Sequence, residues 1–288
     1  MSYDNEKNAV RGGRLYLVAT PIGNLADLSE RAIKTLSEVD VIAAEDTRNS
    51  AKLLSILGIR KPLVSYHDHN RRERGEELAE RLLSGESVAL ITDAGTPGIS
   101  DPGEDMVALC AEKGIPVTLI PGACAGLCGL VLSGLPTGRF IFEGFLSAKS
   151  TERKARLSEL RDETRTVIYH EAPHKLKATL SDMVGIFGGE RKIALCRELT
   201  KLNEEIIRTT LSDALAFYTE NEPRGEYVLV VGGAEKQSGA EFWTELDERE
   251  HVAYYIETRG MSKNDAIKAA ARDRGVHKNE VYKKLAND

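Results

Sequence analysis

The chain has 288 residues, of which 41% are hydrophobic, and it carries a formal net charge of −6. This length and composition allow a large buried core and suggest roughly two domains. No apolar run approaches the ~18 residues of a membrane span, and residues 1–13 lack the apolar centre of a signal peptide. We therefore expect a cytoplasmic protein that does not enter the membrane.

The distribution of charge and the spacing of the cysteines give further information about the class of protein. From residue 259 to the end, eight Lys or Arg stand against four Asp or Glu, so the remaining body is acidic. An acidic body with a basic tail is a reasonable layout for an enzyme with a small nucleic-acid-binding appendage, although it does not demonstrate one. We interpret the cysteines as reduced core residues, since no C-x-x-C pair occurs among Cys110, Cys124, Cys128 and Cys196.

The first half of the chain alternates between strands and helices. Apolar runs predict strands at residues 14–20, 41–46, 63–67, 88–92 and 115–120. Helical patterns, such as those at residues 29–36 and 70–83, lie between them. Five strands separated by helices indicate a parallel sheet that is covered on both faces.

The central feature of this half is the stretch S-V-A-L-I-T-D-A-G-T-P-G-I-S-D-P at residues 87–102. A strand that ends in a glycine-rich loop is where an open α/β sheet holds its ligand. Gly95 and Gly98 would let a ligand approach bare backbone groups, because any Cβ would hold it away. A tight strand-to-helix connection without a ligand is the alternative interpretation.

The pattern changes after Pro121-Gly122. Strand-like runs follow at residues 140–146, 166–169, 193–199, 205–209 and 227–231, with helices near 151–161 and 174–187. The shorter spacing of the later strands is typical of a mixed or antiparallel sheet. We therefore predict a flexible tail at 1–13, an N-terminal α/β domain at 14–121 and a C-terminal α/β domain at 122–236, with a ligand cleft between the two α/β domains.

A polar, glycine-containing linker leads into a third domain, residues 237–288. Ser262 begins a capping-box pattern, Gly275 ends that helix, and residues 278–285 begin another. This spacing matches a helix-turn-helix, whose lysines could lie against phosphates. The candidates are Lys263, Lys278, Lys283 and Lys284. A helical hairpin that packs on the body or on a second copy explains the pattern equally well.

Several common ligand classes are disfavoured. The first strand is not followed by G-x-G-x-x-G, and G-x-x-x-x-G-K-[ST] does not occur, so neither a dinucleotide nor a nucleoside triphosphate is indicated. No metal site is predicted, since His67-Asp68-His69 is too compact to supply three ligands from an extended strand. The expected ligand is a small organic cofactor held by backbone groups.

A set of motifs in this order gives a specific resemblance. The motifs include T-P-I-G-N-L-A-D at 20–27, A-A-E-D-T-R at 43–48, H-D-H-N at 67–70, T-D-A-G-T-P-G-I-S-D-P-G at 92–103, E-G-F-L at 143–146 and G-E-Y-V-L-V-V at 225–231. Residues 14–233 resemble the tetrapyrrole methylase superfamily, whose members hold S-adenosylmethionine between two α/β domains. Within it, the chain is most similar to the bacterial enzymes that methylate the 2′-oxygen of a cytidine in the decoding region of small-subunit ribosomal RNA.

The resemblance implies a fold, partners and cofactor contacts. It implies two α/β domains with a cofactor cleft between them, a small all-α helix-turn-helix-like domain, a homodimer, and ribosomal RNA or an assembled 30S subunit as substrate. The implied cofactor contacts are Pro21, Gly23, Ala94, Gly95, Thr96, Pro97, Ile99, Cys124, Ala125, Tyr169, His170 and Thr209.

Candidates for proton transfer and charge stabilisation stand at strand ends that face the expected cleft. They are Asp46, His67, Asp68, Glu198 and Lys149. Each has a structural alternative: Asp46 could cap a helix that begins at Thr47, Glu198 could pair with a neighbouring cation, and His67 could be a core histidine.

Basic residues after two of the strands could follow an RNA backbone. They are Arg71, Arg72, Lys149, Arg153 and Lys154. Their alternative is the ordinary charged face of a helix. Two other functions also stay open, namely methylation of a small molecule such as a porphyrinoid, and non-catalytic binding to the ribosome.

Overall fold

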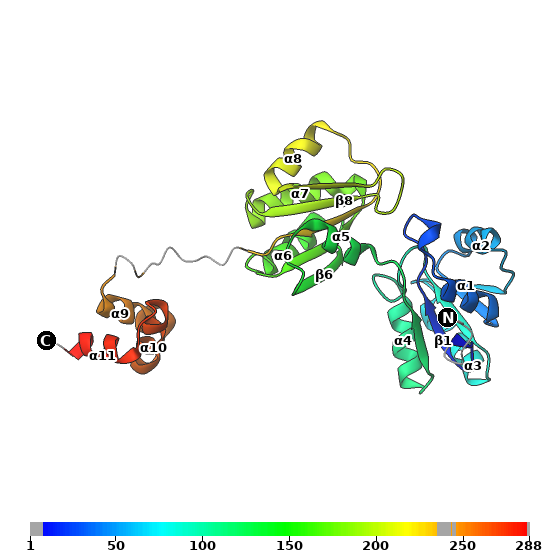
Figure 1. Ribbon diagram of the computed structural model, residues 1–288, viewed down its shortest axis with the longest axis horizontal. Coiled ribbons are helices and arrows are strands. Elements are labelled where there is room, and N and C mark those ends of the chain that lie inside the picture. Colours follow the sequence, from blue (N-terminus) through cyan, green and yellow to red (C-terminus); the bar gives the residue numbers. More distant parts are fainter. Residues whose placement is uncertain (1–7, 235–242, 244–245, 287–288) are drawn as a thin grey trace, which may run out of the picture. The chain divides into compact units, whose positions relative to one another are not determined.

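The computed structural model describes residues 8–234, 243 and 246–286. By its internal contacts the chain divides into two compact units, Met1–Gly233 and Ala234–Asp288 (Figure 1). The first unit contains both sheets, and the second contains the C-terminal helices.

The first sheet is parallel, as predicted, with the strand order β3-β2-β4-β1-β5. Its strands are β1 (Leu15–Val18), β2 (Val41–Ala44), β3 (Leu63–Ser65), β4 (Val88–Ile91) and β5 (Val117–Ile120). Its helices are α1 (Glu30–Glu38), α2 (Thr47–Ile56), α3 (Arg71–Leu83) and α4 (Gly103–Glu112). Separate apolar clusters cover its two faces, which explains why β1, β2 and β4 are buried throughout.

The second sheet is mixed, with the order β6-β7-β10-β8-β9. Only β6 and β7 run parallel, and the other pairs are antiparallel. Its strands are β6 (Phe140–Phe145), β7 (Thr166–Glu171), β8 (Lys192–Arg197), β9 (Glu205–Thr210) and β10 (Tyr227–Val231). Its helices are α5 (Ala125–Ser133), α6 (Ser150–Glu159), α7 (Pro173–Phe187) and α8 (Leu211–Glu220).

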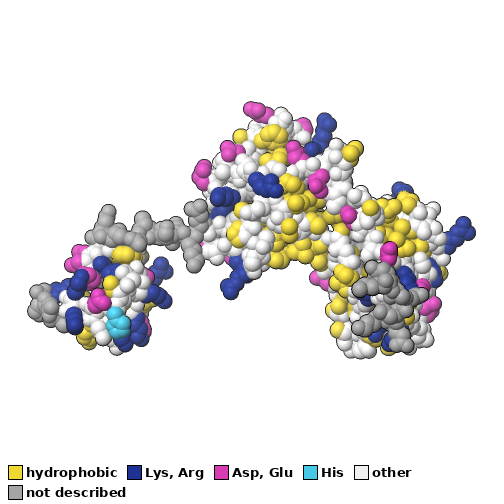
Figure 2. All heavy atoms as spheres, in the orientation of Figure 1, with side chains coloured by type: hydrophobic (Ala, Val, Ile, Leu, Met, Phe, Trp, Pro, Cys, Tyr) yellow, Lys and Arg dark blue, Asp and Glu magenta, His cyan; other side chains and the backbone are white. Residues whose placement is uncertain are grey.

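Helices α5 and α8 were not among the predicted elements. In α5 the sequence A-G-L-C-G-L-V-L-S is apolar on every side, so it lacks the periodicity that marks a surface helix. Gly129 brings α5 close to the sheet, because a Cβ there would lie 2.7 Å from Val228 Cγ1. The outer side of α5 exposes Leu127 and Val131, and Figure 2 shows hydrophobic side chains gathered over α5 and β6.

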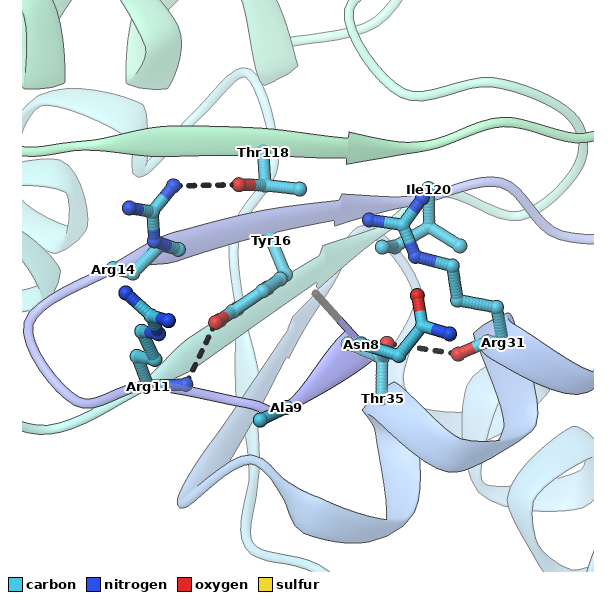
Figure 3. A pocket seen from close by; sticks show the side chains of 9 residues that line it. All are labelled: Asn8, Ala9, Arg11, Arg14, Tyr16, Arg31, Thr35, Thr118 and Ile120. Atoms are coloured by element: carbon cyan, nitrogen blue, oxygen red, sulfur yellow. Dashed lines mark hydrogen bonds between the residues drawn. The ribbon is translucent and has the colours of Figure 1, made fainter. Parts of the chain in front are cut away.

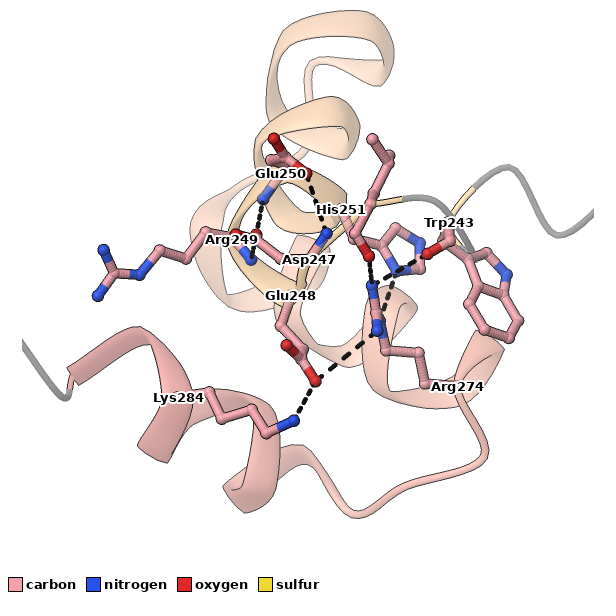
Figure 4. Close-up of polar contacts among 9 residues, drawn as sticks. Trp243, Asp247, Glu248, Arg249, Glu250, His251, Arg274 and Lys284 are labelled. Carbon is pink, nitrogen blue, oxygen red and sulfur yellow. Dashed lines mark hydrogen bonds and ion pairs between the residues drawn. The ribbon is translucent and has the colours of Figure 1, made fainter.

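The second unit consists of α9 (Glu248–Arg259), α10 (Lys263–Asp273) and α11 (Lys278–Ala286) around a small alanine-rich core. Ser262 caps α10 as predicted, and Gly275 adopts a positive φ of 64° just after that helix ends. Arg274 joins the parts of this unit, since its guanidinium donates to the carbonyls of Trp243 and Leu246 and to His251 Nδ1 (Figure 4).

The predicted boundary at residue 122 falls between β5 and α5, and the division into three domains stays a prediction. Within the described ranges, none of the helices has the length and apolar character needed to cross a bilayer.

Candidate functional site

A cavity of about 540 Å³ lies in the first unit and is lined by residues from both sheets. The loops after β4 and β5 form one part of its wall, and the ends of β7, β8 and β10 form another. Its volume is within the range of roughly 300–1,000 Å³ that is usual for small-molecule sites.

The loop after β4 is held in place by its own backbone. Gly95 and Thr20 exchange two backbone hydrogen bonds, of 2.9 and 3.1 Å, which tie this loop to the end of β1. Thr96 Oγ1 donates to the carbonyl of Ala123 at 2.9 Å, which ties the loop to the chain after β5. Gly95 has a φ of +85°, a conformation that side chains disfavour.

Asp101 fixes the second half of this loop. Its carboxylate accepts from the backbone N–H groups of Gly98, Ile99 and Gly103 at 2.8 to 3.2 Å. Ser100 is one of three described non-glycine residues with positive φ, at 65°. The loop is therefore a fixed surface that presents backbone groups to the cavity.

The wall opposite the loop is largely apolar. Cys196, Leu199 and Val228 are at most 6% exposed and come from the second sheet or the segment that follows it. Ile22, which follows β1, packs in the same cluster. This wall could cover a flat apolar group such as a purine ring.

His170 brings an unsatisfied polar atom to the cavity. It lies on β7, its ring packs edge-on against Phe142 and Phe145, and its Nε2 is buried without a hydrogen-bond partner in the described part of the chain. Burial lowers the pKa of His170, so the imidazole is neutral near pH 7. A neutral ring nitrogen of this kind can bind a polar atom of a ligand.

Acidic side chains gather at the ends of β2 and β4. Glu45, Asp93 and Asp101 all line the cavity. The pKa of Glu45 is raised, first by burial and then by the negative charges of Asp93 and Asp101. Asp93 accepts from the backbone N–H of Asp46 and from Asn49. This side of the cavity favours a cationic ligand group.

Several of the expected cofactor contacts do line the cavity. They are Ala94, Gly95, Thr96, Ile99, Cys124, Ala125 and His170. The others lie outside its lining, and their role stays a prediction. Gly23 lies against Thr200 and Lys201, the Tyr169 ring is fully buried, and Thr209 Oγ1 donates to Asp213. Pro21 and Pro97 are neighbours of lining residues.

The five expected catalytic residues lie outside the cavity lining, and their role stays a prediction. Asp46 caps α2 and pairs with Arg48. Glu198 has a positive φ of 50°, and its side chain accepts from Lys201 and from the backbone of Glu226.

The other three candidates have different surroundings. Asp68 and Lys149 are largely exposed, at 73% and 76% of their side chains, and pair with neighbours on the same segment. His67 has a buried Nδ1 without a partner in the described residues.

Some of the side chains expected to contact RNA are exposed, whereas others form ion pairs with carboxylates. Arg72, Lys263, Lys278 and Lys283 are exposed, and none of them forms an ion pair within the part of the chain that the structure describes. Arg71 pairs with Asp105, Lys149 with Glu152, Lys154 with Asp182 and Lys284 with Glu248. Arg153 is buried, and its guanidinium pairs with Asp182 and donates hydrogen bonds to two backbone carbonyls.

The remaining cavity residues were not among the predicted site residues. They are Ile22, Glu45, Thr92, Asp93, Ser100, Asp101, Phe145, Glu171, Ala172, Pro173, Cys196, Leu199, Glu226, Tyr227 and Val228. For Glu45 a signal was available, because it stands beside Asp46 in the A-A-E-D-T-R motif.

Comparison with known proteins places the chain in a family. Residues 14–215 match the model of the Tetrapyrrole (Corrin/Porphyrin) Methylases. The chain is 47% identical over 270 residues to "Ribosomal RNA small subunit methyltransferase I" of Synechocystis sp., covering 94% of this chain and 96% of that protein. It is 48% identical over 273 residues to the protein of the same name from Bacillus subtilis, covering 94% and 93%.

A solved structure agrees with the fold. Uroporphyrin-III C-methyl transferase from Thermus thermophilus, complexed with S-adenyl homocysteine, superposes with a TM-score of 0.54 at 18% identity, covering 76% of this chain and 97% of that chain. The chain therefore belongs to the tetrapyrrole methylase family and, within it, to the group of small-subunit ribosomal RNA methyltransferases that these relatives represent.

Proposed function

We propose that the protein transfers a methyl group from S-adenosylmethionine to the ribose 2′-oxygen of a cytidine in the decoding region of small-subunit ribosomal RNA. The observation that carries the proposal is the cavity, where a fixed backbone loop, an apolar wall and a cluster of carboxylates meet. Identity of 47–48% along nearly the whole chain to proteins named as ribosomal RNA methyltransferases supports the choice of substrate.

The helical unit also favours RNA over a tetrapyrrole. The match to the methylase family ends at residue 215. The Thermus thermophilus structure aligns over 97% of its own length but covers only 76% of this chain. The ribosomal RNA relatives instead cover 94% of it. Residues 234–288 form a separate unit, so an appended helical unit accounts for much of this difference.

The cavity residues fit S-adenosylmethionine. The orphan Nε2 of His170 offers a polar contact, and the backbone of Ala94, Gly95 and Thr96 can hold the methionine part. Cys124 and Ala125 can border the adenosine. The carboxylates complement the positive charges of a sulfonium and an ammonium group. When bound, this donor supplies an electrophilic methyl group on its sulfonium.

Most of the rate enhancement then comes from positioning. The loop after β4 is tied to the ends of β1 and β5, so these groups need little reorganisation during the reaction. Alignment of reacting atoms in a fixed site can contribute roughly 7–11 kcal/mol in favourable cases.

Glu45 is the side chain best placed to accept the proton of the ribose hydroxyl. It lines the cavity, and its carboxylate accepts a hydrogen bond from the backbone of Asp93 but none from a side chain of the described residues. Among the other lining carboxylates, Glu171 binds Lys175 and Thr179, and Glu226 binds Lys201. The raised pKa of Glu45 makes it a stronger base than an ordinary carboxylate.

RNA would be held by cationic side chains outside this acidic cavity. The exposed Arg72, Lys263, Lys278 and Lys283 are available for phosphate contacts. The implied homodimer and the cytoplasmic location also stay predictions, and sedimentation of the purified protein would test the first.

Mass mapping of ribosomal RNA tests the proposal. RNA from cells that lack the protein should lose one ribose methyl group on a small-subunit cytidine, and the wild-type protein should restore it. The Glu45→Gln variant at equal abundance should restore it poorly. An unchanged methylation map would overturn the proposed substrate. Activity retained after deletion of residues 239–288 would favour a small-molecule acceptor.

A further inference from the structure

A second, smaller pocket lies in the first unit, on the side of the sheet that α1 covers. It has a volume of about 160 Å³, and none of its lining residues lines the cavity described above. Arg11, Arg14 and Arg31 all contribute to it (Figure 3). We call it the arginine pocket.

The fold brings the three arginines together from two segments, the chain just before β1 and helix α1, and β5 supplies the third segment of the lining. Arg14 stands directly before β1, and its Nη1 donates to Thr118 Oγ1 on the edge strand β5 at 2.7 Å. Tyr16 and Thr118 are register partners on these neighbouring strands. Arg11 precedes β1, and Arg31 belongs to the first turn of α1. Figure 3 shows Arg11 and Arg14 on the side of Tyr16, and Arg31 beside Ile120.

The pocket collects positive charge that no described carboxylate compensates. Its lining contains three guanidinium groups and no Asp or Glu. Within the described part of the chain, none of the three pairs with a carboxylate, although elsewhere Arg71 and Arg81 do. Like charges that share a concave surface repel one another, so this arrangement favours an anion.

Two hydroxyl groups point to the same ligand class. Tyr16 is 5% exposed, and its hydroxyl oxygen accepts from the backbone N–H of Arg11 at 2.8 Å. The Thr118 hydroxyl oxygen accepts from Arg14. Each hydroxyl keeps its own hydrogen for donation, and no acceptor for either is recorded among the described residues. Because Tyr16 is buried, leaving its hydroxyl hydrogen without an acceptor is costly.

We propose that the arginine pocket binds a phosphate group. Guanidinium groups match phosphate geometry and donate charge-assisted hydrogen bonds to it, and the two hydroxyls would complete the set of donors. The pocket is smaller than the roughly 300 Å³ at which sites for whole organic ligands begin. The phosphate comes either from the backbone of bound RNA or from a free phosphate. The RNA source rests on the proposed function, whereas the phosphate site itself does not.

The first arm of the test uses inorganic phosphate. The full-length protein is titrated calorimetrically at constant ionic strength, beside an Arg11→Gln/Arg14→Gln/Arg31→Gln variant. An Arg60→Gln variant is the control, because Arg60 is exposed, lies before β3 and is outside the pocket lining. We expect the triple variant to weaken phosphate binding at least about tenfold and Arg60→Gln to leave it unchanged.

Two milder variants test the proposal even if the triple variant fails to fold. Tyr16→Phe and Thr118→Val keep all three charges and should still weaken phosphate binding by a few-fold. S-adenosylmethionine binding serves as the folding check, because its proposed site shares no residue with the pocket.

The second arm identifies the source of the phosphate. Binding to a small-subunit ribosomal RNA fragment is measured over a salt series. Each lost contact to a single-stranded backbone phosphate should reduce the slope of log affinity against log salt by about 0.7. A smaller slope in the triple variant identifies the RNA backbone, and an unchanged slope with weakened phosphate binding identifies a free phosphate. Equal phosphate affinity and equal slopes in wild type and triple variant would overturn the proposal.

Discussion

The cavity and the arginine pocket belong to the same unit but have opposite charge. The cavity gathers Glu45, Asp93 and Asp101 where β2 and β4 end. The arginine pocket gathers three guanidinium groups with Tyr16 and Thr118, and its lining contains no carboxylate. Both regions adjoin β1, so one sheet carries a site suited to cations and a site suited to anions.

This difference separates the two tasks of the proposed enzyme. An acidic cavity attracts a sulfonium donor but repels phosphate, so it contributes little to the affinity for RNA. Under the proposed function, affinity for RNA then comes from cationic surfaces elsewhere, namely the exposed lysines of the helical unit and, where RNA is the source of its phosphate, the arginine pocket. Donor binding should accordingly depend weakly on salt, and RNA binding strongly.

The largest expected effect tests the cavity. Glu45→Gln removes the proposed proton acceptor and keeps its shape, so single-turnover methylation should fall by about 10²–10⁴-fold. Quench-flow with excess enzyme measures this rate. Glu38→Gln is the control, because Glu38 is exposed at the end of α1, pairs with Lys34 on the same helix and does not line the cavity. A rate within a few-fold of wild type would show that positioning suffices without this base.

The next largest expected effect concerns the helical unit, which carries the exposed lysines. Arg274→Met removes the bonds to Trp243, Leu246 and His251, so the helical unit should lose about 2–3 kcal/mol of unfolding free energy. Arg272→Met removes an equal charge from an exposed position of the same helix end. Urea unfolding followed by Trp243 fluorescence distinguishes the variants. Equal midpoints would mean that Arg274 does not hold this unit together.

A smaller effect is expected at the loop after β4. Gly95→Ala places a Cβ on a residue with a φ of +85°, a strain of roughly 1–2 kcal/mol. The loop can relieve this strain only by giving up the backbone contacts that hold it in the shape that binds the donor. Donor affinity, measured by titration calorimetry, should therefore fall about five- to thirtyfold. Gly58→Ala, at a φ of +70° with no atom near the added Cβ, carries similar strain away from the cavity. Donor affinity should be unaffected there, and an equal loss in both variants would contradict a specific role for the loop.

The smallest effect is a shift in pH dependence. A base works only when deprotonated, so kcat/KM should rise with pH through the pKa of Glu45, which burial and neighbouring carboxylates raise. Asp93→Asn removes the neighbouring negative charge that raises the pKa of Glu45 most and should move this acidic limb to lower pH. Asp105→Asn, on α4 and outside the cavity, should not move it. A limb that stays in place in Asp93→Asn would exclude Glu45 as the titrating group.

Much of the fold followed from local patterns. The parallel sheet was predicted from five apolar runs separated by helices, and Ser262 caps α10 as the sequence predicted. Helix α5 was missed because it is apolar on all sides and is recognisable only through its packing on the second sheet. Tertiary burial thus determined an element that periodicity could not.

Cavity residues could be predicted where they lie in one local stretch of sequence, but not where tertiary packing brings them together. Ala94, Gly95 and Thr96 lie in one continuous glycine-rich loop, which local sequence reveals. Cys196 and Val228 reach the cavity only because β8 and β10 pair in the second sheet, a long-range arrangement that local sequence does not encode. The arginine pocket was missed because its residues come from three separate segments.

Hydrogen exchange with and without S-adenosylmethionine tests the central claim most directly, namely that the cavity holds a cationic methyl donor through the loop after β4. The account predicts slower amide exchange in residues 92–101 and 123–126 when the donor is present, with no change in residues 8–16 around the arginine pocket. Unchanged exchange in the loop at saturating donor, or protection confined to another part of the chain, would contradict it.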